Sequence, residues 1–365
     1  MGTTQVSASE EQVENPTPDI HPDRVVFRLP DPVMSMAEVN LIQEIRRPRL
    51  GPPFEFDGSD WVLTVPRPNA DRIEYMLHLR HRDGGEETIP DPNNPVVAPG
   101  PFGYKSVIEW SGYAPPDWVA ADAPSGDLVD TSIRSRTLRS DLRTIVWASP
   151  GASVDDSLPL LVAHDGPEYA EFSGLIKCLE VAHHEGRIPS MRAALVAPVE
   201  RNETLSASAA YARALAYEIL PGIEKLANVP HGRSMRIGMG ASLGGLSMLH
   251  LHRHSPAAFG ALFLQSGSFF RQRYDKQESS FPRFRRISRF MGRVLTAEDW
   301  PHPIPVMMTC GTIEENLWNN RATRDALARQ GYEVALHENR DGHNWIGWRD
   351  TFDPYLIDLI ARMWA

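Results

Sequence analysis

A serine between two glycines carries the clearest chemical signal in the sequence. Residues 240–244 read Gly-Ala-Ser-Leu-Gly, after the strand-like run that starts at Arg236 and before a helix-like run. In that setting the pattern predicts a sharp turn that strains the backbone of Ser242 and presents its hydroxyl to a pocket. The positive end of the following helix dipole favours negative charge at the same point. Ser242 is therefore a candidate nucleophile.

A serine nucleophile needs a base, and the base needs an acid that orients it. In hydrolases with a strand-serine-helix turn, the chain order is serine, acid, histidine. His343 lies in a glycine-containing loop after the strand-like run YEVALHE, and Glu314 and Glu315 follow the strand-like run IPVMMTCG. Either glutamate fits the acid position. Asp341 is a weaker candidate because it shares a short loop with the histidine.

The elements that must position these residues fall into two regions. Residues 23–121 contain short apolar runs broken by proline, glycine, asparagine and aspartate, which predicts an all-β sandwich domain. In residues 122–365 strand-like and helix-like runs alternate, which predicts an α/β domain with a largely parallel sheet covered on both faces. Ligands bind at the carboxyl ends of the strands in such sheets. Residues 1–22 lack an apolar core and are predicted to form a disordered tail.

Composition limits the partners and the location. The chain has 365 residues and a formal net charge of -10, which argues against nucleic acid or an anionic membrane as a partner. The N-terminal residues resemble neither a signal peptide nor a membrane span. Cys178 and Cys310 are far apart, and a buried thiol fits Cys310 better than a disulfide does. These features indicate a cytoplasmic protein.

Histidine pairs in the sequence do not form a metal-binding pattern. The runs HLHRH at 250–254 and HH at 183–184 do not match a zinc motif, and no cysteine or carboxylate cluster completes a site. We interpret these histidines as helix-surface residues. The sequence also contains no glycine-rich phosphate loop. We therefore expect neither a metal nor an organic cofactor.

Several segments in order resemble the enterochelin esterases, a family within the esterase D-like group of α/β-hydrolases. They are LLVAHDGPEYAEF, GASLGGLSMLHLHRHSPAAFGALFLQSGSFF, GTIEENLWNNR and DGHNWIGWRD, and the resemblance runs from about Arg143 to the C-terminus. It implies an α/β-hydrolase catalytic domain over residues 122–365, preceded by an immunoglobulin-like β-sandwich over residues 23–121. It also implies an ester hydrolase that needs no cofactor.

The resemblance assigns roles to particular residues. Ser242 corresponds to the nucleophile, His343 to the general base and Glu314 to the acid, with Glu315 as the alternative. The amides of Leu243 and Gly166 correspond to the two donors of the oxyanion hole.

The second oxyanion donor and one substrate loop depart from the family pattern. Pro167 has no N–H where many relatives have an amide, so Gly166 or Glu168 is left to supply the donor. The loop after Arg201 has its glutamate two residues on, at Glu203, rather than three. Four residues near these loops are expected to contact substrate, namely Asp165, Glu168, Tyr169 and Arg201.

A basic segment in this acidic chain has two interpretations. Between Arg271 and Leu295, apolar residues keep helical spacing and leave Arg285, Arg286 and Arg289 on other faces. The helix is either a solvated amphipathic helix or a cap whose arginines attract an anionic ester.

The sequence therefore predicts a serine ester hydrolase that cleaves an ester or lactone, such as that of a siderophore, through an acyl-enzyme. The substrate is a small molecule, and the resemblance makes an anionic one the first candidate. Two alternatives remain open. One is acyl transfer to an alcohol, as in the related mycolyltransferases, and the other is a non-catalytic binding protein.

Overall fold

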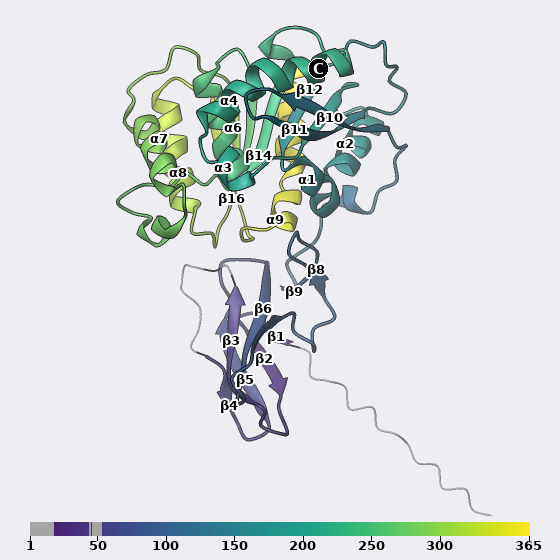
Figure 1. Ribbon diagram of the computed structural model, residues 1–365. Helices are drawn as coiled ribbons and strands as arrows, with labels where there is room; N and C mark the ends of the chain where they lie inside the picture. Colours follow the sequence, from purple (N-terminus) through teal and green to yellow (C-terminus); the bar gives the residue numbers. More distant parts are fainter. Residues whose placement is uncertain (1–17, 44, 46–52) are drawn as a thin grey trace, which may run out of the picture.

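The computed structural model describes residues 18–43, 45 and 53–365 and has two domains (Figure 1). The N-terminal domain contains two antiparallel sheets. The first has the order β1-β2-β5-β4, with β1 (Asp19–Ile20), β2 (Arg24–Pro30), β5 (Asp60–Pro66) and β4 (Glu55–Phe56). The second has the order β3-β6-β9-β8, with β7 paired to β6; its strands are β3 (Met36–Gln43), β6 (Arg72–His81), β9 (Lys105–Glu109), β8 (Val97–Ala98) and β7 (Glu86–Ile89).

Alternating side chains explain why these two sheets face each other. In β2 the residues Val25 and Phe27 are buried, and in β5 Leu63 and Val65 are buried, with more exposed residues between them. A period of two places all the buried side chains of a strand on one face of its sheet. They share one core with β6 residues such as Leu77. The all-β prediction is confirmed, whereas the immunoglobulin-like class of the sandwich stays a prediction.

The C-terminal domain is built on one sheet of eight strands in the order β10-β11-β13-β12-β14-β15-β16-β17. The first three strands in this order pair antiparallel, and all later neighbours are parallel. The strands are β10 (Asp127–Ser135), β11 (Ser140–Ala148), β13 (Arg192–Val196), β12 (Leu160–His164), β14 (Arg236–Ala241), β15 (Ala261–Gln265), β16 (Val306–Gly311) and β17 (Val334–Asn339). Strands β12, β13 and β15 are buried along their whole length, as expected where helices cover both faces.

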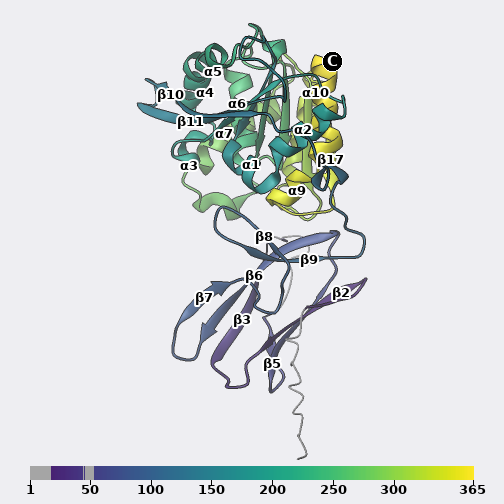
Figure 2. The same cartoon turned by 90° about the vertical axis from the view of Figure 1, so that its right-hand side faces the viewer.

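Helices cover both faces of this sheet and form a separate apolar core on each (Figure 2). One core includes residues of α1 (Gly166–Ser173), α2 (Leu175–His184), α9 (Trp345–Arg349) and α10 (Ile357–Trp364). The other includes residues of α4 (Ala209–Ala214), α5 (Leu220–Ala227), α6 (Leu243–His254), α7 (Phe284–Thr296) and α8 (Leu317–Arg329). Shorter helical segments are η1 (Asp117–Val119), α3 (Arg201–Thr204), η2 (Leu215–Ile219), η3 (Arg233–Met235), η4 (Lys276–Ser280) and η5 (Phe352–Leu356). The α/β prediction is confirmed.

Two ends of the predicted domains differ in the structure. Residues 1–17 of the predicted disordered tail lie outside the described residues, but β1 pairs with β2, so the sandwich begins before residue 23. At the other end, Trp118 is buried in the core of the C-terminal domain and stacks on Phe352 at 6.3 Å between ring centroids. The chain therefore joins the second domain before the predicted boundary at residues 121 and 122.

The sandwich docks against the edge of the large sheet where β16 and β17 end (Figure 1). Thr312, just after β16, donates from Oγ1 to the carbonyl of Asn69 at 2.5 Å. Arg340, just after β17, donates from Nε to Asp71 Oδ2 at 2.9 Å. Ile313 is buried in the core of the sandwich itself. The two loops that carry the candidate acid and base therefore both rest on the N-terminal domain.

Within the described part of the chain, every helix is too short or too polar to cross a membrane.

Candidate active site

Ser242 occupies a strained turn between β14 and α6. Its backbone angles are φ 56° and ψ -120°, which side-chain-bearing residues rarely adopt. A Cβ on Gly240 would lie 2.5 Å from the backbone carbon of Gly244, so only glycine permits this close approach of strand and helix. The Ser242 amide donates to the carbonyl of Gln265 at 2.9 Å, which ties the turn to β15. The structure therefore contains the strained turn that the sequence pattern predicts.

Glu314 and His343 form a hydrogen-bonded pair. His343 Nδ1 lies 2.7 Å from Glu314 Oε2. The carboxylate is 3% exposed, and its other oxygen accepts from Ser266 Oγ at 2.6 Å and from the Gly311 amide at 2.7 Å. A carboxylate fixed in this way favours the imidazole tautomer with the proton on Nδ1, which leaves Nε2 as an acceptor. An acceptor at Nε2 is what a general base requires.

The other two acid candidates have different partners. Glu315 Oε1 accepts a hydrogen bond from Gln277 of η4. Asp341 is buried and accepts from the Gly342 amide at 2.6 Å and from Asn344 Nδ2 at 2.8 Å. Glu314 is therefore the carboxylate that holds the imidazole Nδ1.

One cavity of about 260 Å³ brings the three candidate residues together. Inside it, Ser242 Oγ lies 3.1 Å from Ser268 Oγ. The cavity is lined by Ser242, Ser268, Phe270, Glu278, Glu314, Glu315, Asn316 and His343. Sequence reasoning missed Ser266 and Ser268, although both lie in the segment QSGSFF that carries part of the family resemblance.

The two candidate oxyanion donors are the first residues of helices. Leu243 begins α6 and Gly166 begins α1, and the first amides of a helix have no carbonyl partner within it. A Cβ on Gly166 would lie 2.3 Å from Leu195 Cα, so glycine is required for this approach to β13. Pro167 follows in the first turn of α1, a position that needs no N–H. Both amides therefore have no acceptor within their own helices, which is the position that the predicted oxyanion donors require.

Asp165 and Arg201 form an ion pair beside the serine turn. Arg201 donates from Nε and Nη2 to the two oxygens of Asp165 at 2.8 and 2.7 Å. The Asp165 carboxylate lies at the start of α6, 3.5 Å from where a Cβ on Gly244 would be. Burial alone lowers the pKa of Arg201, but Asp165 raises it above its ordinary value. The Arg201 side chain remains 42% exposed, so it can contact a ligand while paired.

Two of the predicted substrate contacts have other surroundings. Tyr169 is fully buried and donates to Gln265 Oε1 at 2.6 Å, so the structure corrects this prediction and assigns the side chain to the core. Glu168 is partly buried, and burial raises the pKa of its carboxyl. Its Oε2 atom has no hydrogen-bond partner among the described residues. For Tyr169, the sequence does not indicate whether the side chain points toward the substrate or into the core.

The basic segment approaches the cavity without its arginines. Arg286 donates to the Ser206 carbonyl and to Glu203 Oε1, each at 2.6 Å, and Arg283 also pairs with Glu203. Arg285 and Arg289 are exposed on α7. The segment reaches the cavity through Glu278 instead, and none of its arginines lines the cavity, so the arginine cap is not formed in this structure. Glu203, the glutamate whose spacing departs from the family pattern, neutralises the charges of Arg283 and Arg286.

A second cavity, of about 190 Å³, lies between the two domains and shares His343 with the first. The sandwich contributes the loop of residues 99–105, and the C-terminal domain contributes the start of α9. Phe102 is 100% exposed and Tyr104 is 61% exposed, facing a cavity that Trp345 and Trp348 also line. Sequence reasoning missed this cavity. Its sequence signal is two aromatic residues in a loop rich in proline and glycine, PGPFGYK, because exposed aromatic side chains often mark a binding site.

No group of three histidine, cysteine or carboxylate side chains suited to a metal ion occurs within residues 18–43, 45 and 53–365.

The interpretation of the HLHRH histidines as surface residues is wrong for His252. That ring is buried and lies 3.0 Å from the Tyr332 hydroxyl.

Comparison with known proteins decides the family. A family model described as "Putative esterase" matches residues 137–359. The chain belongs to this esterase family. It is accordingly a carboxylic ester hydrolase of the enterochelin esterase-like type.

Enterobactin esterases align with most of the length of this esterase. The iron(III) enterobactin esterase of Escherichia coli strain K12 is 24% identical over 311 residues, which are 82% of this chain and 73% of that protein. The enterobactin esterase from Shigella flexneri, solved in the presence of enterobactin, gives a TM-score of 0.73 at 20% identity and covers 98% of each chain. A ferulic acid esterase from Anaeromyces mucronatus, in complex with ferulic acid, gives 0.52 at 16% identity, over 68% of this chain and 97% of that one. These likenesses confirm the α/β-hydrolase fold.

Proposed function

We propose that this esterase is a serine hydrolase in which Ser242 is the nucleophile, His343 the general base and Glu314 the acid that orients it. The observation that carries the proposal is the 2.7 Å contact between Glu314 and His343 Nδ1 in the cavity that Ser242 lines. The strained turn at Ser242 supports the same assignment.

The proposed reaction has two halves. Ser242 Oγ attacks the ester carbonyl as His343 Nε2 takes its proton, and the amides of Leu243 and Gly166 stabilise the oxyanion. The C–O bond to the alcohol then breaks, and the imidazolium returns the proton to the leaving oxygen. A water molecule attacks the acyl-enzyme, gives a proton to His343 and releases the acid. The proton finally returns to Ser242.

We propose an aryl-bearing siderophore ester or lactone as the substrate class. The names of the relatives support it: one acts on iron(III) enterobactin, and a Shigella enzyme was solved in the presence of 2,3-dihydroxy-N-benzoyl-serine. The aromatic cavity beside His343 also supports it, because Phe102 and Tyr104 offer ring faces to a benzoyl group next to the reacting ester. An anionic substrate remains part of the proposal, with Lys105, which lies 3.5 Å from Glu74 in the same cavity wall, rather than the α7 arginines.

A substrate panel tests this class. Changing Phe102 and Tyr104 together to alanine should raise KM for aryl siderophore lactones and feruloyl esters by roughly 5- to 150-fold, because ring pairs contribute about 0.5–1.5 kcal/mol each beyond burial. Short p-nitrophenyl acetate and acyl sugars should show little change. The matched control is Tyr217→Ala, another exposed aromatic outside this cavity. Equal effects on aryl and alkyl esters would contradict the aryl site.

Added alcohols in the same assay separate hydrolysis from acyl transfer. We expect free acid as the main product, since no described feature of the cavity selects an alcohol over water. Ester products in excess of acid would favour the transferase alternative. Membership of the esterase family already favours catalysis over a purely binding role.

The pH dependence follows from the role of the imidazole. A protonated imidazole cannot accept the serine proton, so kcat/KM should be low near pH 5 and should rise to a plateau by about pH 8. The measurement is kcat/KM for a neutral ester across this range, so that substrate ionisation does not contribute. A rate that is independent of pH from 5 to 8 would exclude a histidine base.

We also propose a cytoplasmic location. Both cysteines are buried free thiols, which suits a reducing compartment.

A further inference from the structure

The N-terminal sandwich holds the loop that carries His343. Arg72, the first residue of β6, is 2% exposed and reaches this loop from the sandwich side. Its Nη1 atom donates to Asn344 Oδ1 at 3.2 Å and lies 3.7 Å from Asp341 Oδ2. On its own domain, Arg72 pairs with Glu74 at 3.0 Å and with Glu109 at 3.6 Å. The guanidinium therefore joins two carboxylates of the sandwich to the histidine loop.

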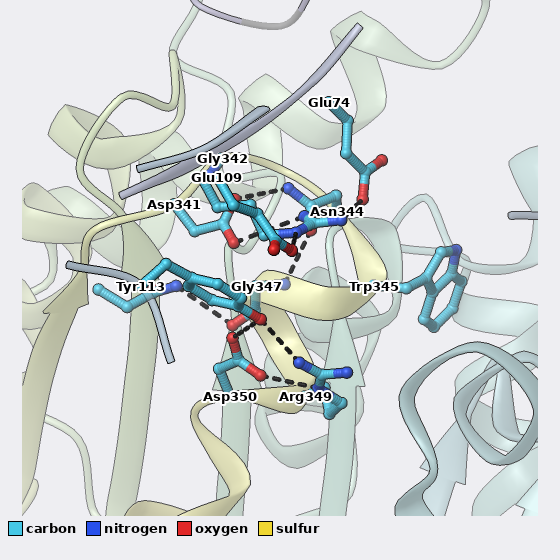
Figure 3. A network of polar contacts seen from close by, with 12 residues as sticks. Glu74, Glu109, Tyr113, Asp341, Gly342, Asn344, Trp345, Gly347, Arg349 and Asp350 are labelled. Atoms are coloured by element: carbon cyan, nitrogen blue, oxygen red, sulfur yellow. Dashed lines mark hydrogen bonds and ion pairs between the residues drawn. The ribbon is translucent and has the colours of Figure 1, made fainter. Parts of the chain in front are cut away.

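The two residues on either side of His343 in the chain, Gly342 and Asn344, both donate hydrogen bonds to the Asp341 carboxylate. The Gly342 amide and Asn344 Nδ2 donate to Asp341 Oδ1 at 2.6 and 2.8 Å (Figure 3). Asn344 also caps α9, because its Oδ1 accepts from the Gly347 amide at 2.8 Å. The same Oδ1 receives the bond from Arg72. One arginine thus contacts both the helix cap and the carboxylate that bracket the base.

The C-terminal end of α9 is also held by a residue that precedes the α/β sheet, Tyr113. Tyr113 donates to Asp350 Oδ2 at 3.0 Å and accepts from Arg349 Nη2 at 2.8 Å (Figure 3). The helix that follows His343 is therefore fixed at both ends by residues outside the α/β sheet. This leaves the imidazole loop little freedom to shift while the domains are docked.

The positive charge of Arg72 compensates the buried carboxyl of Asp341, so a neutral side chain cannot replace it without loss. Burial outweighs the opposing effects of Arg72 and of the hydrogen bonds from Asn344 and Gly342, so the pKa of the Asp341 carboxyl is raised to about 7. The Oδ2 atom of Asp341 has no hydrogen-bond partner in the described structure, so the cation is what compensates its charge. Without the guanidinium, the pKa of Asp341 would rise further, so this buried carboxyl would either take up a proton or stay as an unpaired charge, and either change alters the contacts of the histidine loop.

We propose that Arg72 of the N-terminal sandwich is a positioning residue for catalysis, which holds His343 in place through Asn344 and Asp341. The inference rests on the proposed roles of Ser242, His343 and Glu314. It gives the sandwich a part in the chemical step in addition to substrate contact. A displacement of about 1 Å at a catalytic group can cost about 100-fold in rate.

The test compares Arg72→Gln with Arg72→Lys. We expect Arg72→Gln to lower kcat for a p-nitrophenyl ester by about 10- to 100-fold, with KM changed less than about threefold, because the base is displaced while the cavity remains. Arg72→Lys keeps the charge but loses the forked contact, so its kcat should be intermediate. The rate of Ser242 labelling by a fluorophosphonate should fall in the same order. Thermal unfolding of each variant is measured alongside.

A charge-neutral double variant separates positioning from general damage. Arg72→Gln combined with Asp341→Asn should recover only part of the lost kcat: asparagine keeps the acceptor for Gly342 and Asn344 without a buried charge, but the bond from Arg72 to Asn344 stays absent. The matched control is Arg80→Gln, on the same strand but in an exposed ion pair with Glu38 at 2.6 Å, which should retain the wild-type kcat. If Arg72→Gln does not fold, Arg72→Lys and the double variant decide the question.

The outcomes are distinguishable. A wild-type kcat in Arg72→Gln, an equal loss in Arg80→Gln, or full recovery of kcat in the double variant would overturn the positioning role. Failure of the wild-type protein to be labelled at Ser242 would overturn the proposed function, whatever the Arg72 variants do.

Discussion

Replacing Ser242 by alanine should lower ester turnover by about 10⁴- to 10⁶-fold, with the fold retained. In the proposed mechanism the hydroxyl is the atom that attacks, and removing any member of a catalytic triad leaves only the catalysis due to binding and the oxyanion hole. Alanine fits the turn as well as serine does, because the strained φ of 56° concerns the backbone and not the hydroxyl. Steady-state kcat and the mass shift on fluorophosphonate labelling measure the effect.

Ser268→Ala is the matched control for this variant. Its hydroxyl lies 3.1 Å from that of Ser242 in the same cavity, so it experiences the same solvent and the same neighbours. We expect a loss of less than about tenfold, the size of one neutral hydrogen bond. If Ser268→Ala instead lost activity as Ser242→Ala does, or if Ser242→Ala kept more than a tenth of the rate, the nucleophile would have to be reassigned.

Glu314→Gln should reduce kcat/KM by about 10⁴-fold, because the substitution reverses the imidazole tautomer. The oxygen of the new amide would be held by Ser266 Oγ and the Gly311 amide, which both donate to Oε1. Its NH₂ group would then face His343 Nδ1 and make that nitrogen an acceptor. The proton would reside on Nε2, where it prevents the imidazole from acting as a base.

The adjacent Glu315→Gln is the control for loop damage. Its carboxylate accepts from Gln277 at the edge of the cavity, and an amide oxygen can still accept that bond. We expect kcat/KM within about threefold of the wild-type value, as is usual for substitutions that keep exposed contacts. The reverse result, with Glu315→Gln inactive and Glu314→Gln active, would move the acid to Glu315. Both variants are compared at pH 8.

Local sequence determined the parts of this site that depend on local structure. The strand, the glycine pair and the helix around Ser242 are contiguous, so their pattern predicted the turn directly. The choice between Glu314 and Glu315 stayed open, because adjacent loop residues point in different directions and only the donors at Ser266 and Gly311 select one of them.

Contacts over long distances along the chain left no readable signal. Arg72 and Asn344 are 272 residues apart, and nothing in either segment alone indicates that they meet. The choice between a solvated helix and an arginine cap stayed open for a related reason: the charges were visible in the sequence, but the pairing of Arg283 and Arg286 with Glu203 depends on how α3 and α7 pack. Tyr169 looked like a ligand contact, whereas its hydroxyl satisfies the buried Gln265.

The docking of the histidine and glutamate loops on the sandwich has a consequence for how such enzymes can be recombined. A segment beginning at residue 122 would contain Ser242, His343 and Glu314, yet it would expose Ile313 to water and leave Thr312 and Arg340 without Asn69 and Asp71. Exchanging sandwiches between relatives would therefore transplant part of the catalytic geometry together with the binding loop. In this protein the surface between the domains thus belongs to the proposed site as much as to the fold.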